Sequence, residues 1–300
     1  MRLDNFDLNL LVAFNVLMEE RSVTAAARRM NITQPAMSAA LKRLRDSFQD
    51  ELLVQNGKKM FPTPHALALA PEVDATLVRF RSLISTGTVF DPATSKRQFK
   101  LVTSDYITTV LLVPLIRTLH EEAPGIRLDL SLPSPESPEL IERGEADLVI
   151  SPERFMTGSH PREKIFEERL VVVGCRSNPA LEGSMSVDRF LACGHVSTRI
   201  AGRDTFIEEA LGKTIGERRV EVTAQSFIQV PWLLRNTNRL AVMHERLAGV
   251  CADPLSLRIA TPAFDLPVMA EMMMYHSTRS KDEGLAWLRR KLIEVARSTA

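Results

Sequence analysis

The stretch Arg21–Arg45, RSVTAAARRMNITQPAMSAALKRLR, has the pattern of two short helices joined by a tight turn. It contains basic residues and no acid. Ser22 is suited to cap a first helix over residues 23–30, and Thr33 to cap a second, because a side-chain oxygen there accepts a hydrogen bond from a first-turn N–H. Pro35 falls in the first turn of the second helix, where a missing N–H costs little. This pattern is typical of a helix-turn-helix.

The second of these helices has one apolar and one polar face. Its predicted apolar stripe consists of Met37, Ala40, Leu41 and Leu44. On the other face Gln34 can pair with an adenine edge at two points, and Ser38 can contact a base or a phosphate. Lys42, Arg43 and Arg45 are suited to phosphates, which position a helix without reading sequence. The alternative is a solvated basic helix pair, but the Thr-Gln-Pro start and the lack of acids favour DNA binding.

The flanking segments complete a winged helix-turn-helix over residues 1–63. Residues 5–20 predict a helix that packs behind the pair, with a buried stripe of Leu10, Leu11, Phe14, Leu17 and Met18. Residues 48–63 predict a hairpin, since Asn56-Gly57 is a strong turn signal between two apolar arms. Lys58 and Lys59 at its tip are expected to meet the DNA backbone or minor groove, and the alternative is a solvated turn.

Residues 64–86 predict one long helix that links two domains. Its apolar residues follow spacings of three and four: Ala70, Val73, Leu77, Phe80 and Ile84. This spacing is that of a coiled-coil seam, so we predict dimerisation through Val73, Leu77, Phe80 and Ile84. A dimer would present two recognition helices to a two-fold DNA site. The alternative is that this face packs on the downstream domain of its own chain.

The pattern changes to alternating strands and helices after a hinge at residues 87–96, which is rich in small and turn-forming residues. Residues 97–300 predict an α/β domain with mostly parallel sheets. We expect two lobes: lobe I at about 97–170 and 268–300, and lobe II at about 171–267. Two crossovers, near Val171 and Pro267, would join them.

The segment SVTAAARRMNITQPAMSAALKRLR, followed by LLVQNGKKMFPTP, resembles the N-terminal domain of LysR-type transcriptional regulators. The resemblance extends over the whole chain. It is closest to the branch with the nodulation regulators that sense flavonoids and the regulators of naphthalene, salicylate and chlorinated-aromatic degradation. This chain departs from the pattern at Gln55, where many members have Arg, and at Pro64-His65-Ala66, where many have Gly. The resemblance implies a periplasmic-binding-protein-like effector domain. The residues expected to contact DNA are Arg28, Thr33, Gln34, Pro35, Ser38, Lys42, Arg43, Lys58 and Lys59.

Candidate effector contacts follow from the sheet architecture, because ligands of open α/β sheets sit at the carboxyl ends of strands. Ser104, Tyr106 and Thr108 offer hydroxyls near a helix N-terminus, where anions and phenolate oxygens are favoured. Phe227 is suited to stack on an aromatic ring. Asp105 is expected to cap the helix. The full candidate set is Ser104, Tyr106, Thr108, Glu153, Phe155, His195, Ser197, Phe227 and Tyr275, and each has the alternative of a core or surface polar residue.

Composition limits the other classes of function. The net charge is +1, with 45% hydrophobic and 25% charged residues, as in a soluble globular protein. The three cysteines are widely spaced without a Cys-x-x-Cys pair, which suggests neither a zinc site nor a disulfide framework and favours the cytoplasm. No nucleotide-binding, nucleophile-elbow or metal-ligand motif is present. We therefore expect no cofactor, no metal, no membrane span and no enzyme activity.

The leading hypothesis is a sequence-specific transcription regulator. Its expected partners are double-stranded DNA, a small aromatic or phenolic effector bound between the lobes, a second copy of itself as homodimer or homotetramer, and RNA polymerase. The resemblance implies activation more often than repression. One alternative is a solute-binding or enzymatic α/β module with an appended helical domain, and another is a regulator without an effector.

Overall fold

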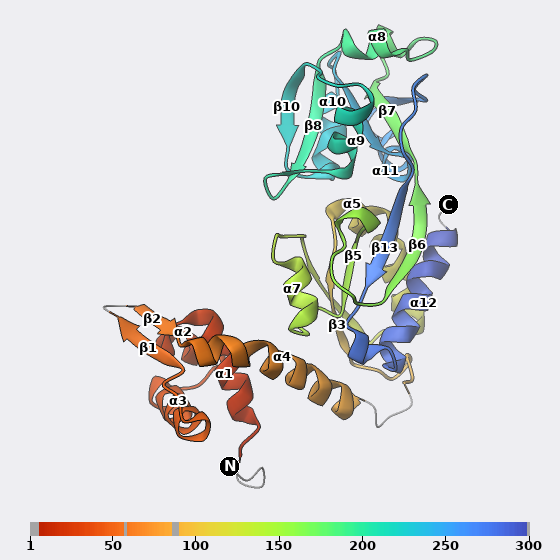
Figure 1. The fold of residues 1–300 in the computed structure, drawn as a ribbon. Coiled ribbons are helices and arrows are strands. Elements are labelled where there is room, and N and C mark those ends of the chain that lie inside the picture. The colour runs from red at the N-terminus through yellow and green to blue at the C-terminus, as the bar shows by residue number, and fades with distance from the viewer. Residues whose placement is uncertain (1–5, 57–58, 86–89, 299–300) are drawn as a thin grey trace. The chain divides into compact units, whose positions relative to one another are not determined.

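The computed structural model describes residues 6–56, 59–85 and 90–298, and the side chains of these residues except 56, 59, 78, 79 and 81–85. Its contacts separate an N-terminal unit, up to residue 87, from a C-terminal unit that comprises most of the remainder. Figure 1 shows the elements of both. Among the described residues, no helix combines the length and the apolar character needed to cross a membrane.

The N-terminal unit is helical with a two-stranded wing (Figure 1). Its elements are α1 (Asn9–Glu20), α2 (Val23–Arg29), α3 (Gln34–Phe48), β1 (Leu53–Asn56), β2 (Lys59–Pro62) and α4 (Pro64–Ser85). Both predicted caps are confirmed. Ser22 Oγ accepts from the backbone N–H of Ala25 at 3.3 Å, and Thr33 Oγ1 accepts from that of Ala36 at 3.4 Å.

The core of this unit gathers the predicted apolar stripes. Its buried members include Leu10, Phe14, Leu17, Ala26, Met37, Leu41 and Leu44. Phe48 at the end of α3 adds aromatic contacts, with its ring centroid 6.2 Å from that of Phe14. This packing holds the backs of α2 and α3 against α1, so the other face of α3 is turned to solvent.

The C-terminal unit has two lobes, each built on one sheet (Figure 1). In lobe I the strand order is β4 (Arg127–Ser131), β3 (Gln98–Val102), β5 (Leu148–Pro152), β13 (Met269–Met274), β6 (Arg162–Glu168). In lobe II it is β10 (Val220–Ala224), β8 (His195–Ile200), β11 (Leu240–His244), β7 (Leu170–Cys175), β12 (Leu257–Ala260), and β9 (Arg203–Asp204) pairs with β8. The chain crosses between lobes at β6–β7 and again at β12–β13, as predicted.

Helices cover both sheets. Those of lobe I are α5 (Asp105–Ile107), a π-helical turn η2 (Thr108–Leu112), α6 (Val113–Glu122), α7 (Ser137–Glu142) and α12 (Glu283–Ser298). Those of lobe II are α8 (Val187–Leu191), α9 (Phe206–Thr214), α10 (Val230–Leu234) and α11 (Glu245–Cys251). Four short 3-10 turns complete the unit: η3 (Glu153–Phe155), η4 (Pro179–Leu181), η5 (Phe227–Gln229) and η6 (Ser277–Arg279).

The sheets are mixed, where the sequence predicted mostly parallel ones. In lobe I, β3 is parallel to β4 and β5, but β13 is antiparallel to both β5 and β6. In lobe II, β8 is parallel to β10 and β11, but β7 is antiparallel to β11 and β12. The reason is the double crossover, because a strand that arrives from the other lobe enters the sheet in the opposite direction.

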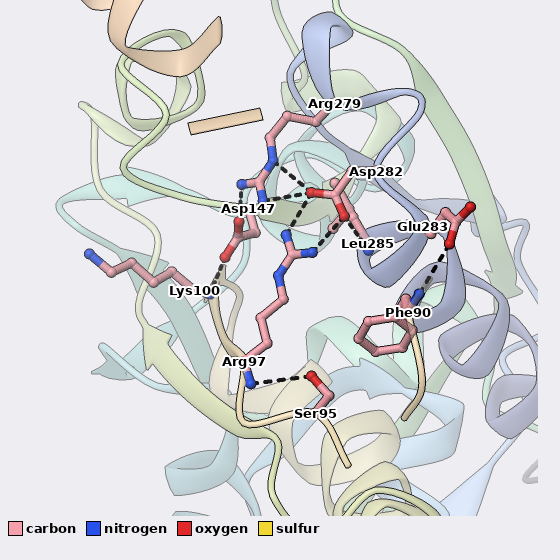
Figure 2. Close-up of polar contacts among 9 residues, drawn as sticks. All are labelled: Phe90, Ser95, Arg97, Lys100, Asp147, Arg279, Asp282, Glu283 and Leu285. Carbon is pink, nitrogen blue, oxygen red and sulfur yellow. Dashed lines mark hydrogen bonds and ion pairs between the residues drawn. The ribbon is translucent and has the colours of Figure 1, made fainter. Parts of the chain in front are cut away.

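A buried ion network anchors the segment that enters lobe I (Figure 2). Arg97, just before β3, binds Asp282 through both guanidinium ends, at 2.5 and 2.6 Å. Arg279 donates to the same carboxylate at 2.9 Å and also to Asp147. The second oxygen of Asp147 accepts from the backbone N–H of Lys100 at 2.6 Å. Charge pairing and hydrogen bonds together compensate the burial of these four side chains.

Candidate functional site

The structure gives α3 the two faces that the sequence predicts. Met37, Leu41 and Leu44 are buried, whereas Gln34 and Ser38 are exposed in its first turns. The neighbouring candidates Thr33, Pro35, Lys42 and Arg43 are also exposed. A helix with short polar groups at its exposed N-terminal end and basic groups further along has the form that enters a DNA major groove.

The basic residues of the helix pair are used in different ways. Arg28 is exposed at the end of α2. Arg43 is exposed and forms a surface ion pair with Asp7, with a nitrogen–oxygen distance of 3.3 Å. Arg45 differs from the prediction, because its guanidinium donates to the backbone oxygens of Glu51 and Leu53 at 2.8 and 2.7 Å. Arg45 thus holds the first strand of the wing to α3, which sequence spacing alone did not reveal.

The wing forms with the predicted pairing, in which Asn56 lies opposite Lys59 and Leu53 opposite Pro62. The predicted contact Lys58 lies outside the described residues. Lys59 begins β2, but its side chain also lies outside the described part of the structure. Their proposed contacts with DNA therefore remain predictions.

The predicted seam on α4 is partly occupied within the chain. Val73 and Leu77 are buried in the core of the N-terminal unit, 4% and 7% exposed, because α4 packs against α1. Phe80 is half-buried, and the side chain of Ile84 lies outside the described residues. The first half of the stripe is thus explained by packing on upstream helices of the same chain, which neither prediction for this face had anticipated.

A cavity of about 520 Å³ opens between the two lobes. It lies at the carboxyl ends of the parallel strands, where β5 leads into η3 and β8 into β9. Four predicted candidates line it: Ser104, Tyr106, Phe155 and Phe227. Its volume is in the range of small-molecule sites.

Aromatic rings from both lobes meet at the cavity. The ring of Tyr106 from lobe I stacks on that of His244 from lobe II, with centroids 3.7 Å apart and planes at 10°. Phe227 meets both rings edge-on, at 6.2 and 4.9 Å. Beside them, Asp105 accepts hydrogen bonds from the Ser226 hydroxyl and from the backbone N–H groups of Phe227 and Ile228, the latter two at 3.3 Å. Asp105 therefore ties the lobes together. The prediction that Asp105 caps the helix was wrong, because the cap is Ser104, whose Oγ accepts from the backbone N–H of Ile107 at 3.2 Å.

Buried titratable groups lie under these rings. The Tyr106 hydroxyl donates to Glu168, which also accepts from the backbone N–H of Arg246 at 3.2 Å. Burial raises the pKa of Glu168, and the bonds from Tyr106 and Arg246 offset part of that effect. Burial lowers the pKa of His244 to about 3, so this imidazole is neutral near pH 7. Burial, together with the nearby Glu168, raises the pKa of Glu271 well above 4.5.

Five predicted effector contacts lie elsewhere, and their placement is corrected. His195 and Ser197 are at the start of β8, so they lie away from its carboxyl end; His195 Nε2 binds the Phe190 carbonyl oxygen at 3.0 Å and Ser197 binds Thr223 at 3.1 Å. Tyr275 follows β13, whose antiparallel direction carries it to the opposite edge, where its hydroxyl donates to Glu163 at 3.2 Å.

The remaining two of the five have local roles. Thr108 begins the π-helical turn η2 directly after α5, and its hydroxyl donates to the backbone oxygen of Ser104 at 3.0 Å. Glu153 is exposed in η3 and is not one of the lining residues.

Several lining residues were absent from the candidate set, notably Glu271, His244, Ser134 and Arg203. Arg203 belongs to β9, just before α9 begins at Phe206. A signal for Glu271 was present in the sequence: it is the single charged residue in the apolar segment VMAEMMMYH.

Family comparisons agree with this architecture. The model described as the bacterial regulatory helix-turn-helix protein of the lysR family matches residues 8–67. The model described as the LysR substrate binding domain matches residues 93–297. The chain belongs to the LysR family. The resemblance seen in the sequence and the predicted fold class are therefore confirmed, and membership of a family of transcriptional regulators favours that hypothesis over an enzymatic module.

Relatives and solved structures cover nearly the whole LysR-type chain. Nodulation protein D 1 of Bradyrhizobium diazoefficiens is 39% identical over 302 residues, covering 100% of this chain and 96% of the relative. Nodulation protein D 3 of Rhizobium leguminosarum bv. phaseoli is 40% identical over 299 residues, covering 99% of each. A probable transcriptional regulator of Pseudomonas aeruginosa is 30% identical with a TM-score of 0.65 and covers 97% of each chain. Full-length OxyR from the same organism, at 16% identity, shares the fold with a TM-score of 0.74, covering 99% and 97%.

Proposed function

We propose that this chain is a cytoplasmic regulator that reads promoter DNA through α3 and responds to a small aromatic or phenolic effector bound between its lobes. The observation that carries the effector half is the cavity lined by the stacked Tyr106 and His244 rings with Phe227 edge-on. Stacked and edge-on rings are the arrangement that receives a further aromatic ring. The similarity of this chain to nodulation proteins D supports an aromatic effector as well, because the sequence resembles the branch with the nodulation regulators that sense flavonoids.

The DNA half of the proposal rests on the exposed N-terminal end of α3. Gln34 would pair with an adenine edge, while Arg28, Lys42 and Arg43 would meet phosphates. Lys58 and Lys59 would add wing contacts. CbnR, whose solved structure is a complex with its target DNA, shares the fold at a TM-score of 0.58 over 98% of this chain, which supports a comparable use of the N-terminal unit.

The base-reading role of Gln34 is tested by gel shift with a promoter fragment and single-base variants of it. Gln34→Ala should relax preference at one base pair at a cost of about 1–3 kcal/mol. Lys42→Ala is the matched control, since loss of a phosphate contact should weaken all fragments equally and reduce the salt dependence. Equal weakening of all fragments by Gln34→Ala would overturn the assignment of this residue to the groove.

The effector role is tested by the thermal stability of the full-length protein with phenols and aromatic acids. A ligand at 100 times its Kd should add about 2.7 kcal/mol. Phe227→Ala should remove most of that gain and leave affinity for DNA unchanged. A ligand whose effect survives Phe227→Ala would bind outside the cavity.

We further propose that the working form is a homodimer or homotetramer, which recruits RNA polymerase and activates transcription. Because Val73 and Leu77 already pack within the N-terminal unit, the self-contact would use the later part of α4, beginning at Phe80. Sedimentation should give at least twice the chain mass, and Phe80→Lys should lower it. An unchanged mass would overturn the role of Phe80.

A further inference from the structure

Glu271 is a buried ionisable group of the cavity lining. It lies in β13 between Ala270 and Met272, it is 2% exposed, and it is part of the cavity lining. Its Oε2 atom is buried without a hydrogen-bond partner in the described part of the chain, and it forms no ion pair there. A buried carboxyl group in this situation is costly as an anion, because nothing replaces the water it has lost.

The neighbouring buried carboxyl group, Glu168, has both a cation and hydrogen-bond donors. The Arg246 guanidinium lies 3.7 Å from Glu168, and the backbone N–H of Arg246 and the Tyr106 hydroxyl donate to the same group. Of these two buried carboxyl groups, Glu168 has a guanidinium beside it and Glu271 forms no ion pair among the described residues. Like charges at short range disfavour a second ionisation, and the group without donors is the one that keeps its proton. The raised pKa of Glu271 has this direction.

The rest of the cavity floor also lacks fixed charge. His244 is neutral, and its buried Nδ1 has no hydrogen-bond partner among the described residues. The cations in the lining lie at the rim: Arg154 is exposed and paired with Glu209, and Arg203 is exposed. A ligand carboxylate beside Glu271 and His244 would thus lose its water without gaining a cation from the buried part of the lining.

We infer that Glu271 is a specificity-determining hydrogen-bond donor, which presents its O–H to an uncharged oxygen of the effector and selects neutral aromatic ketones and phenols over aromatic carboxylates. A protonated carboxyl group in an apolar site acts as such a donor. This inference rests on the proposed effector cavity.

The test compares two probes, 4-hydroxyacetophenone and 4-hydroxybenzoate, which differ in that one carries a ketone and the other a carboxylate. Their binding to the full-length protein is measured by titration calorimetry at about pH 7.5. The ketone should bind at least about tenfold more tightly than the acid, since a buried unpaired charge costs more than one such factor. Glu271→Gln keeps an N–H donor and should bind the ketone as the wild type does. Glu271→Leu removes the donor and should lose about tenfold in affinity for the ketone. Glu153→Gln, an exposed acid outside the lining, is the control and should change neither affinity.

The possible outcomes distinguish a failure of the Glu271 inference from a failure of the proposed effector cavity. Equal or tighter binding of the acid by the wild type would overturn the selectivity, and this comparison needs no variant to fold. Full affinity of Glu271→Leu for the ketone would overturn the role of Glu271. If Phe227→Ala and the Glu271 variants all left binding unchanged, the ligand would sit elsewhere and the proposed cavity itself would fall. Failure of both probes to bind would overturn the inference and the effector class together.

Discussion

The C-terminal unit contains two buried polar groups that differ in how their charges are compensated. In the entry network of Figure 2, Arg97 and Arg279 face Asp147 and Asp282, so two cations meet two anions. At the cavity, buried Glu168 behind the lining has a cationic neighbour, Arg246, whereas buried Glu271 in the lining forms no ion pair among the described residues. The first arrangement is complete within the chain and has a structural role. The second leaves the hydrogen-bonding capacity of Glu271 unused among the described residues, as the proposed effector site requires.

The two groups also titrate in opposite directions. Burial by itself raises the pKa of Asp282, but hydrogen bonds from Arg97 and the Leu285 backbone, with the charges of Arg97 and Arg279, lower it to about 2. The pKa of Glu271 is raised because no donor opposes burial. Depth alone therefore does not decide the protonation state of a carboxyl group in this molecule; the partners do.

The largest expected effect comes from breaking the complete network. Asp282→Ala should lower the free energy of unfolding by about 3–5 kcal/mol, because Arg97 and Arg279 lose their shared carboxylate while remaining mostly buried. Urea denaturation of the full-length protein measures this. Asp253→Ala is the control, since its pair with Arg176 is exposed and should be worth less than about 1 kcal/mol. A loss below that of the control would contradict the structural role of the network.

The same network predicts acid sensitivity. The folded pKa of Asp282 lies below its unfolded value of 3.8. Its contribution to the free energy of unfolding is therefore complete above about pH 4 and is lost as the pH falls toward about 2.

A smaller loss is expected at the floor, from Tyr106→Phe. It removes the hydroxyl that donates to buried Glu168 and should lower the free energy of unfolding by about 1.5–3 kcal/mol, the range for hydrogen bonds to charged groups. Tyr275→Phe is a matched control, because its hydroxyl donates to the partly exposed Glu163. Urea denaturation measures both losses. Similar losses in the two variants would contradict the idea that a hydrogen bond to buried Glu168 stabilises the fold more than one to partly exposed Glu163.

His244→Phe tests the floor in acid. The folded pKa of His244, about 3, is below its unfolded value of 6.5, so its stabilising contribution is present above pH 6.5 and is lost as the pH falls toward 3. Between the unfolded pKa of 6.5 and about pH 5, the free energy of unfolding of the wild type should fall by about 2 kcal/mol relative to that of the variant. This follows from a change of about 1.4 kcal/mol per pH unit. Parallel stability curves for the two proteins between pH 7 and 5 would mean that His244 is hydrated.

The smallest effect, and the only gain, is expected from Glu271→Gln. The raised folded pKa of Glu271 means that its proton stabilises the fold below pH 4.5 and that this advantage is lost as the pH rises toward the folded value. The amide has no proton to lose, so the variant should gain stability relative to the wild type as the pH rises from about 5 to 8. A difference that does not change with pH would show that Glu271 titrates normally.

The helix-turn-helix was predictable because its signals are local. Caps at Ser22 and Thr33, the position of Pro35 and the apolar stripe of α3 depend on neighbours within a few residues, and these predictions agree with the structure. The two lobes and their crossovers were also predictable, since strand and helix patterns alternate along the chain. The face of α4 was not predicted correctly, because periodicity reveals an apolar stripe and not the element that covers it.

The order of residues by itself thus determined the family, the helix-turn-helix and the two-lobed plan. Only the tertiary structure decided which residues line the cavity. Strand direction removed His195 and Tyr275 from the site, and it placed Glu271 there from the middle of an apolar strand. It also decided that Arg246 compensates Glu168 and not Glu271. The physical reason is that charge compensation acts over a few ångströms between residues far apart in sequence, and no local pattern encodes that distance.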